Sequence, residues 1–274
     1  CLDIGLYNTI QLYINTIVTG IMIEIKDIQK SFGDSMILKG ISTVFETGKT
    51  NLIIGQSGSG KTVLLKSLLG IHTPESGKIC FDGRVYSEIE PDEKRELRTE
   101  IGMVFQGSAL FDSMTVAENV AFPLRMFTTD NKAKIKERVD FVLERVALTD
   151  AHDKLPSQIS GGMQKRVAIA RAIVNKPKYL FCDEPNSGLD PNTAILIDNL
   201  IKEITEEYDI TTVINTHDMN SVMEIGERIL FLKDGLKAWE GTKEEIFKTD
   251  NQAVVDFVYS SNLFKKVREA YLKE

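Results

Sequence analysis

A glycine-rich stretch, GQSGSGKT, lies between two apolar runs and is the first feature of the sequence whose residue types could do chemistry. It satisfies the pattern G-x-x-x-x-G-K-[ST], in which backbone N–H groups turn inward around a phosphate, the lysine adds a positive charge, and the hydroxyl binds Mg²⁺. We expect the following residues to hold the phosphates of a nucleotide: Gly55, Gln56, Ser57, Gly58, Ser59, Gly60, Lys61, Thr62 and Val63. Val63 stands where a dinucleotide-binding loop would need its third glycine, which disfavours that alternative.

An acidic pair ends another apolar run, YLFCDEP, further along the chain. A carboxylate at the C-terminal end of a buried strand can hold Mg²⁺, and we assign this role to Asp183. Glu184 is the next residue and points differently, so we expect it to polarise an attacking water. Together with the glycine-rich loop, these two acids predict a site that hydrolyses a nucleotide.

A second candidate anion site precedes the acidic pair, in the segment ISGGM. Ser160 stands at an N-cap position, and Gly161 and Gly162 leave N–H groups exposed at the start of a helix. An ordinary capped helix without a ligand is the alternative for this segment. The helix is predicted to bury a stripe formed by Met163, Val167, Ala170 and Val174.

Strands and helices must position these loops, and the apolar pattern predicts both. Buried runs alternate with helical stretches, which indicates a parallel sheet covered on both faces. The N-terminal region looks β-rich, with a strand pair that turns at Thr47–Gly48, and KICFDGRVY predicts a hairpin at Asp82–Gly83. From residue 89 to about 170 the pattern is mostly helical and charged, which suggests an inserted helical lobe.

The composition disfavours several functions. The chain has 274 residues, and its 33 Lys and Arg residues against 40 Asp and Glu residues give a formal net charge of −7. Nonspecific binding to nucleic acid requires basic surfaces, so we expect no nucleic-acid partner. Cys1, Cys80 and Cys182 are odd in number and widely spaced, which indicates neither a disulfide framework nor a zinc site. A reducing, cytoplasmic setting fits this cysteine content.

With these motifs in place, the chain resembles the nucleotide-binding subunits of ABC transporters over most of its length. GQSGSGKT is similar to the Walker A motif, ISGGM to the family signature, and the acidic pair to the Walker B aspartate and the catalytic glutamate. Phe32 resembles the aromatic residue that stacks on adenine, although tyrosine is more usual there. Gln106 resembles the Q-loop glutamine that touches Mg²⁺, Asp190 in SGLD the D-loop aspartate, and His217 the switch histidine.

The resemblance implies a fold and a mechanism. The fold would be α/β, a P-loop NTPase with a RecA-like core, an N-terminal antiparallel β subdomain and an inserted α-helical subdomain at about 89–170. Two copies would bind head to tail around two ATP molecules with Mg²⁺, each ATP between one Walker A loop and the signature segment of the other copy. Dimer closure would drive an integral membrane permease, with the chain bound peripherally at the cytoplasmic face of the inner membrane.

One position that departs from the family pattern indicates a particular branch of the family. The family signature usually ends in glutamine, and this chain has Met163 there. Together with the segment FQGSALFDSMTVAENVAFPL, from Phe105 to Leu124, this methionine is similar to the ATPases of MCE-linked, Mla-type phospholipid transporters. That branch implies phospholipid cargo and an MCE-domain lipid-binding protein as a further partner. The phosphate contacts of the family signature come from the serine and backbone amides, so nucleotide binding and hydrolysis are expected to tolerate Met163.

Three other functions fit parts of the sequence. An ABC importer of amino acids or other small solutes would carry the same catalytic motifs. A soluble ABC ATPase usually has two tandem cassettes or a long coiled-coil insertion, whereas this sequence shows one cassette. A GTPase would read guanine with N-K-x-D, but in NTHD the lysine is replaced by Thr216, and the signature segment would be unexplained.

The two ends of the chain differ from its middle. Residues 1–21 have no basic segment and a broken apolar run, and a patterned strand opens at Met22, so we expect these residues to be upstream or non-native. The ABC ATPase domain is then predicted over residues 22–252. Residues 253–274 form a helix-compatible tail, which either packs on its own core or docks on the dimer partner or a regulator.

Overall fold

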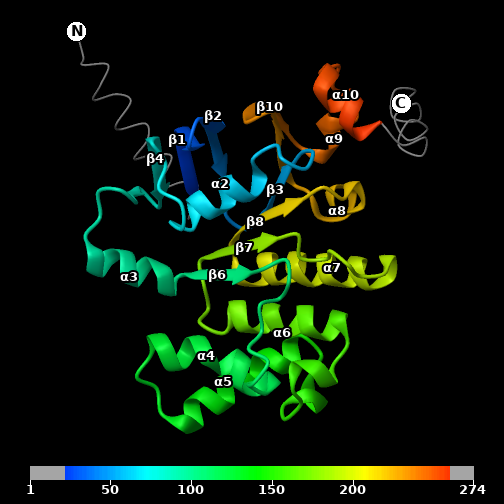
Figure 1. Ribbon diagram of the computed structural model, residues 1–274. Coiled ribbons are helices and arrows are strands. Elements are labelled where there is room, and N and C mark those ends of the chain that lie inside the picture. The colour runs from blue at the N-terminus through cyan, green and yellow to red at the C-terminus, as the bar shows by residue number, and fades with distance from the viewer. Residues whose placement is uncertain (1–21, 260–274) are drawn as a thin grey trace.

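The computed structural model describes residues 22–259, so the predictions for residues 1–21 and for residues 260–274 lie outside the described residues. None of the helices in this range is both long and apolar enough to span a membrane. The elements (Figure 1) follow one another as β1 (Ile23–Phe32), β2 (Ser35–Phe45), β3 (Thr50–Ile54), α2 (Lys61–Leu68), β4 (Ser76–Phe81), β5 (Arg84–Val85), α3 (Pro91–Thr99), β6 (Ile101–Val104), α4 (Val116–Phe127), α5 (Lys132–Arg145), η1 (Thr149–Ala151), η2 (Pro156–Gln158), α6 (Gly161–Ile173), β7 (Tyr179–Asp183), α7 (Pro191–Tyr208), β8 (Thr211–Thr216), α8 (Met219–Ile225), β9 (Arg228–Lys233), β10 (Leu236–Gly241), α9 (Lys243–Ile246) and α10 (Gln252–Val258).

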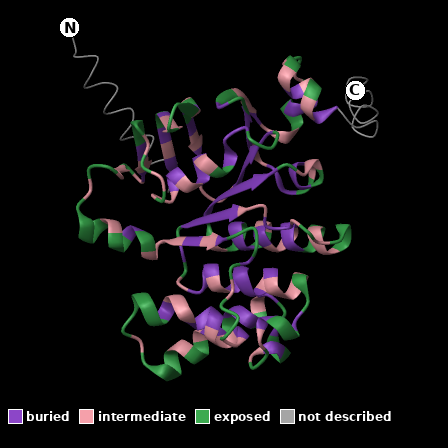
Figure 2. Cartoon of the chain, in the orientation of Figure 1, coloured by how far each residue is buried: buried purple, intermediate pink, exposed green. Residues whose placement is uncertain are grey.

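A six-stranded sheet forms the centre of the molecule, in the order β10-β9-β3-β8-β7-β6. Five of its strands run parallel, and β10 pairs antiparallel with β9 at one edge. β3 and β8 are buried at every residue, as Figure 2 shows. The predicted parallel sheet with both faces covered is confirmed, because strands that are buried at every residue require a layer of structure on each face of the sheet.

A second sheet is antiparallel and has the order β2-β1-β4-β5. The predicted hairpin at Asp82–Gly83 joins β4 to β5 and is confirmed. The predicted strand pair that turns at Thr47–Gly48 is wrong, because β2 and β3 flank that turn but enter different sheets. The physical reason is burial: β2 alternates between exposed and buried residues, which suits an antiparallel edge, whereas β3 is buried throughout.

Alternate residues of the central strands face two separate cores. Phe181 and Val213 pack with α2 and the antiparallel sheet, whereas Cys182 and Ile214 pack with α6, α7 and α8. Figure 1 shows α2 above β6 and β7 and α6 below them. The glycine-rich loop before α2 and the signature segment before α6 therefore belong to opposite faces of one sheet.

Helices fill most of the segment from residue 89 to 170, but a strand interrupts it. Ile101–Val104 forms β6, which pairs with β7 at the sheet edge. The expectation of a mostly helical stretch missed β6 because four residues are too few to show a strand period. α4, α5 and α6 follow β6 and pack on one another. We propose that the helical subdomain begins after Val104 rather than at residue 89.

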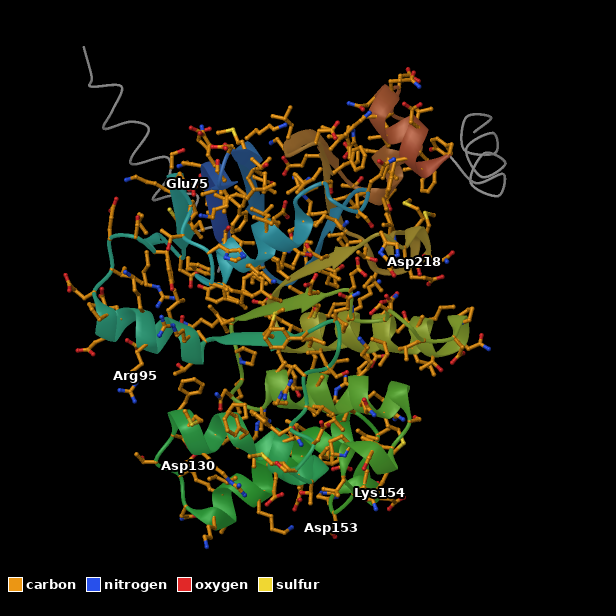
Figure 3. The ribbon with its side chains drawn as sticks, viewed as in Figure 1. Glu75, Arg95, Asp130, Asp153, Lys154 and Asp218 are labelled. Atoms are coloured by element: carbon orange, nitrogen blue, oxygen red, sulfur yellow. The ribbon has the colours of Figure 1, made fainter. Side chains whose placement is uncertain are left out.

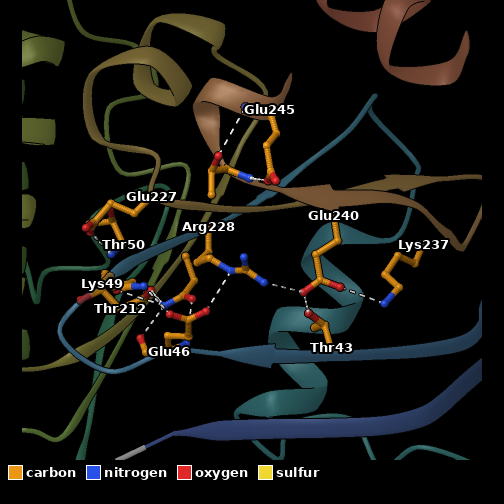
Figure 4. Close-up of polar contacts among 12 residues, drawn as sticks. Thr43, Glu46, Lys49, Thr50, Thr212, Glu227, Arg228, Lys237, Glu240 and Glu245 are labelled. Carbon is orange, nitrogen blue, oxygen red and sulfur yellow. Dashed lines mark hydrogen bonds and ion pairs between the residues drawn. The ribbon is translucent and has the colours of Figure 1, made fainter. Parts of the chain in front are cut away.

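A polar network joins the two sheets near β9 and β10 (Figure 4). Arg228 at the start of β9 forms ion pairs with Glu46 at 3.0 Å and with Glu240 of β10 at 3.6 Å. Glu240 also accepts a hydrogen bond from the hydroxyl of Thr43 in β2 at 2.6 Å. Because Thr43 and Glu240 belong to different sheets, these contacts fix where the antiparallel sheet sits against the central one.

The last described helix packs on the body of the same chain. The Phe257 ring of α10 lies 5.1 Å from the Phe231 ring of β9, centroid to centroid, and two valines of α10 are buried. Tyr259 donates a hydrogen bond to the carbonyl oxygen of Ile246 at 3.3 Å. The start of the predicted tail, residues 253–259, therefore packs on its own core.

Candidate active site

The glycine-rich loop connects β3 to α2. Gly55, Gly58 and Gly60 have φ angles of +149°, +81° and +105°, which favour glycine. A Cβ on Gly55 would lie 2.3 Å from the carbonyl oxygen of Leu232, so a side chain does not fit there. Gly60 is the N-cap of α2 and offers no capping side chain. The first N–H groups of α2 are therefore left for an anionic ligand.

The glycine-rich loop surrounds the side chain of Lys61, which is 6% exposed. Its Nζ donates hydrogen bonds to the carbonyl oxygens of Gly55 at 2.8 Å and Gln56 at 3.1 Å. Burial lowers the pKa of Lys61, while the carboxylates of Glu184 and Asp183 act in the opposite direction. The ammonium group is thus placed between the phosphate loop and the two acids.

The acidic residues lie at the C-terminal ends of the parallel strands. Asp183 ends β7, and its Oδ1 accepts hydrogen bonds from Thr62 Oγ1 at 3.5 Å and from Asn215 Nδ2 of β8 at 3.1 Å. Ligand sites of parallel sheets form at this edge, because the strand ends bring several loops together. The fold thereby joins Thr62 to Asp183, which are 121 residues apart in the sequence.

Glu184 is contacted on both carboxylate oxygens. His217 Nδ1 lies 2.9 Å from Oε1, and Gln106 Nε2 donates to Oε2 at 3.3 Å. The backbone of Glu184 has a φ of +46°, a strained value for a residue with a side chain, and its N–H donates to the carbonyl oxygen of Asn215 at 3.0 Å. Figure 3 labels Asp218, the residue after His217, near the end of β8.

Phe32 ends β1 and is 46% exposed. Its ring packs edge-on against His72, with ring centroids 5.1 Å apart, and Lys30 Nζ lies 5.2 Å from the ring centroid. An exposed aromatic ring held by its neighbours is suited to stacking on a nucleotide base.

The signature segment starts α6. Ser160 is the N-cap, and its Oγ accepts a hydrogen bond from the N–H of Met163 at 3.3 Å. The predicted stripe is half-buried at Met163 and buried at Val167, Ala170 and Val174. Within residues 22–259, no hydrogen bond or ion pair links Ser160, Gly161 or Gly162 to the phosphate loop.

Asp190 caps α7 beside the signature segment. Its carboxylate accepts hydrogen bonds from the hydroxyl of Thr193 at 2.5 Å and from its N–H at 3.1 Å, and these bonds lower the pKa of Asp190. A Cβ on Gly162 would lie 2.7 Å from the methyl carbon of Thr193. The D-loop and the signature segment are therefore packed together within one chain.

Known proteins with similar sequences identify the family. A family profile described as ABC transporter matches residues 38–187, more than half of the chain. The probable ribonucleotide transport ATP-binding protein mkl of Mycobacterium leprae is 38% identical over 239 residues, which cover 87% of this chain and 69% of that protein. The chain belongs to the ABC transporter family. The methionine import ATP-binding protein MetN of Clostridioides difficile is also 38% identical, over 82% of this chain and 70% of its own length.

Solved ABC structures share the fold. The dimeric structure of MJ0796, a bacterial ABC transporter cassette, has a TM-score of 0.73 at 33% identity and covers 81% of this chain and 98% of its own. The cassette cbiO1 of Clostridium perfringens, part of the transporter complex cbiONQ, has a TM-score of 0.77 at 30% identity. The match covers 90% of this chain and 97% of cbiO1. The expected fold class is confirmed, and the chain is an ABC-type ATPase, the ATP-binding subunit of a transporter.

The donor set of this ABC cassette fits Mg²⁺. In nucleotide sites Mg²⁺ is held by one or two carboxylates together with phosphate oxygens and water. The described part of the chain contains no cluster of three or more His, Cys, Asp or Glu side chains that would hold a metal by itself. Thr62, Asp183 and Gln106 would hold the ion with the nucleotide, and the ion would neutralise charge on the phosphates.

Two cations of α6, the buried Lys165 and the half-buried Arg171, hold a loop that the sequence does not connect with them. Lys165 on α6 is 5% exposed, and its Nζ donates to the main-chain carbonyl of Gln106. Arg171 on the same helix donates to the carbonyl oxygens of Ser108 at 2.6 Å and Ala109 at 2.7 Å. In the sequence both looked like ordinary charged residues of an amphipathic helix, because their acceptors lie about 60 residues earlier. α6 thus holds the loop that carries Gln106.

Proposed function

We propose that this ABC-type ATPase works as a head-to-tail homodimer that hydrolyses ATP to drive an integral membrane permease, with phospholipid as cargo and an MCE-domain protein as a further partner. The observation that carries the hydrolytic part is the placement of Glu184 between His217 and Gln106, beside Lys61. No other carboxylate among residues 22–259 has this set of neighbours.

Each site residue has a role in this proposal. Lys61 and the N–H groups of the loop bind the β- and γ-phosphates, and Phe32 stacks on the adenine. Glu184 orients a water and takes its proton as the oxygen attacks the γ-phosphorus, and the bond to the β–γ bridging oxygen breaks to give ADP and phosphate. His217 keeps the carboxylate of Glu184 in place through its Nδ1.

The dimer explains why the chain has two anion-binding helix starts. The signature segment and the phosphate loop belong to opposite faces of the central sheet. A second copy placed head to tail brings its signature segment, with Ser160, Gly161 and Gly162, to the phosphates that Lys61 binds. The related cassette MJ0796 forms a dimer, and one of its structures holds ADP and phosphate after hydrolysis, which supports this arrangement.

The cargo is inferred from two features. Met163 and the segment from Phe105 to Leu124 are similar to Mla-type ATPases, and this segment exposes two aromatic rings, Phe105 at 40% and Phe111 at 41%. Exposed aromatic side chains are frequent where proteins meet partner proteins. Import of a small solute is the second candidate, favoured by the similarity to MetN, which is named for methionine import.

The test is to tag the chain in its native cell, solubilise the membranes gently, and identify co-purifying proteins and lipids by mass spectrometry. A multi-span permease with an MCE-domain protein and phospholipid is the expected result. A permease with a solute-binding protein would replace phospholipid by a small solute. Recovery without any membrane protein would contradict the proposed permease partnership.

A further inference from the structure

Three buried polar side chains meet next to the catalytic loops. Asn186, Asp198 and Ser221 are 9%, 3% and 1% exposed. Asn186 Nδ2 lies 3.3 and 3.1 Å from the two carboxylate oxygens of Asp198 and 2.8 Å from Ser221 Oγ, and it donates to both groups. These three side chains are termed the Asn186 cluster.

The Asn186 cluster joins both catalytic loops to a helix. Asn186 lies two residues after Glu184, and Ser221 lies four residues after His217, in the first turn of α8. Asp198 projects from α7, the helix that starts after the D-loop. The loop of the catalytic glutamate is therefore tied to the helix that follows the switch histidine, in addition to the direct contact between the two side chains.

A buried aspartate at position 198 costs folding free energy that an apolar residue would not. Burial raises the pKa of Asp198 to about 6. Asp218, the N-cap of α8, and Glu224 within that helix add to this effect, while the hydrogen bonds of the cluster act in the opposite direction. Burial and, to a lesser degree, the charge of Asp198 raise the pKa of the Cys182 thiol of β7. An apolar side chain would avoid the desolvation of a carboxylate in this interface. The acid is therefore better explained by a role in the site.

The hydrogen bonds of the Asn186 cluster depend on one another. The amide of Asn186 has two protons, and the geometry directs one toward Asp198 and the other toward Ser221. Asn186 therefore bridges Asp198 and Ser221, and while burial raises the pKa of the Asp198 carboxylate, Ser221 in turn lowers it. A shift of the loop or of α8 would leave a buried polar group without a partner, which is unfavourable. The cluster therefore favours one relative position of the loop and α8.

We propose that Asp198 is a positioning residue for ATP hydrolysis. Through the Asn186 cluster it holds the loop that carries Glu184 in register with the helix that follows His217. Asp198 contacts neither the phosphate loop nor the residues assigned to Mg²⁺, so it is expected to affect the chemical step and not the affinity for ATP. This inference rests on the catalytic roles proposed for Glu184 and His217.

The test compares two substitutions in steady-state ATP hydrolysis by the full chain. Asp198→Leu fills the space and removes the hydrogen bonds, and we expect kcat to fall about tenfold with KM for ATP within about twofold of wild type. Asp198→Asn keeps an acceptor oxygen, and we expect it to retain roughly half of kcat or more. Thr205→Val is the matched control, because Thr205 is a buried polar residue of the same helix that bonds to Ile201 and Thr212, and its kcat is expected to stay unchanged.

A second background separates positioning from a general loss of structure. When Asp198→Leu is added to a His217→Ala protein, no histidine remains for the cluster to position. We therefore expect the double variant to hydrolyse ATP at the residual rate of His217→Ala alone. Wild-type kcat in Asp198→Leu, or an equal fall in both backgrounds, would overturn the proposal. If Asp198→Leu does not fold, Ser221→Ala removes the bond from Asn186 to α8 in the same cluster and gives the same readout. Glu184→Gln is measured separately, and a wild-type rate there would refute the proposed catalytic glutamate without deciding the role of Asp198.

Discussion

At the scale of single residues, we propose that Glu184 decides whether bound ATP is hydrolysed. Glu184→Gln keeps the size of the side chain and one acceptor oxygen but cannot take a proton from water. We expect kcat to fall by about 10²–10⁴ while ATP stays bound and the dimer stays closed. Size-exclusion chromatography with ATP checks this, with Lys61→Ala as the comparison that loses nucleotide affinity and remains a monomer. A monomeric Glu184→Gln protein in ATP would count against the role of this residue.

Asp198 makes the stability of the cassette depend on pH. Its pKa is about 6 in the folded protein against 3.8 for an ordinary aspartate, so between these values the folded state binds more protons than the unfolded state. The free energy of unfolding therefore falls as pH rises through this window, by about 2–3 kcal/mol in total.

Asp198→Asn does not titrate and removes this dependence. We expect the variant to melt several degrees above wild type near neutral pH, and the difference to vanish as the pH approaches about 4. Thermal unfolding followed by circular dichroism at several pH values measures both. A variant that melts below wild type at neutral pH would show that the cluster favours the charged carboxylate.

At the scale of elements, the β9–β10 turn supports the phosphate loop. The N–H of Gly235 donates to the carbonyl oxygen of Ser59 at 3.3 Å, and its own carbonyl oxygen accepts from the N–H of Lys39 at 2.9 Å. Gly235 has a φ of +79°, and a Cβ there would lie 2.2 Å from the carbonyl oxygen of Ile37. We expect Gly235→Ala to displace the turn, destabilise the protein by about 2–3 kcal/mol and raise the KM for ATP.

Gly83→Ala is a matched control for this substitution. Gly83 has the same φ of +79° in another hairpin turn, but no atom lies within 4 Å of its added Cβ. We expect this variant to lose about 1 kcal/mol of unfolding free energy through backbone strain alone, with an unchanged KM for ATP. Chemical unfolding and ATPase assays compare the two, and equal effects would refute the supporting role of the β9–β10 turn.

α6 positions the loop that carries Gln106 through a buried lysine. Lys165→Met keeps the apolar stem and removes the charged donor to the Gln106 carbonyl. We expect the Mg²⁺ concentration for half-maximal activity to rise about tenfold, with little change in KM for ATP, because supporting contacts of a metal site set its affinity. Arg166→Met is the control, since Arg166 binds the carbonyl oxygens of Val146 and Ala147 at the end of α5. An equal Mg²⁺ shift in both variants would indicate a stability effect only.

At the scale of the whole molecule, the proposal that two copies share each ATP site predicts complementation. Lys61→Ala and Ser160→Arg are each expected to be inactive alone. In an equal mixture half of the dimers are mixed, and each mixed dimer has one site with an intact phosphate loop and an intact signature segment, so we expect roughly a quarter of the wild-type rate of phosphate release. The double variant mixed equally with wild type is the control. Its mixed dimers contain no intact site, so only the wild-type homodimers are active, and the rate is expected to fall to about a quarter rather than to the half that independent copies would give. A mixture as inactive as the single variants would contradict the head-to-tail arrangement.

Features encoded over a few neighbouring residues were predictable. The phosphate loop needs glycines and a lysine at fixed spacing between a strand and a helix, and all of these lie within twenty residues of sequence. The cap at Ser160 and the hairpin at Asp82–Gly83 follow from local rules of the same kind. The family motifs in their order were enough to assign the fold class.

Strand partners and side-chain contacts across long separations were decided by the tertiary structure. β3 and β6 were placed wrongly or missed, because the sheet order β10-β9-β3-β8-β7-β6 does not follow the order of the chain. The contacts of Lys165 and the Asn186 cluster were equally hidden, since a buried polar residue is recognisable only when its neighbours are known. The sequence by itself determined what chemistry the cassette has, through local spacing. Packing decided which distant groups meet around Glu184, because burial and hydrogen bonding act between elements that only the folded chain brings together.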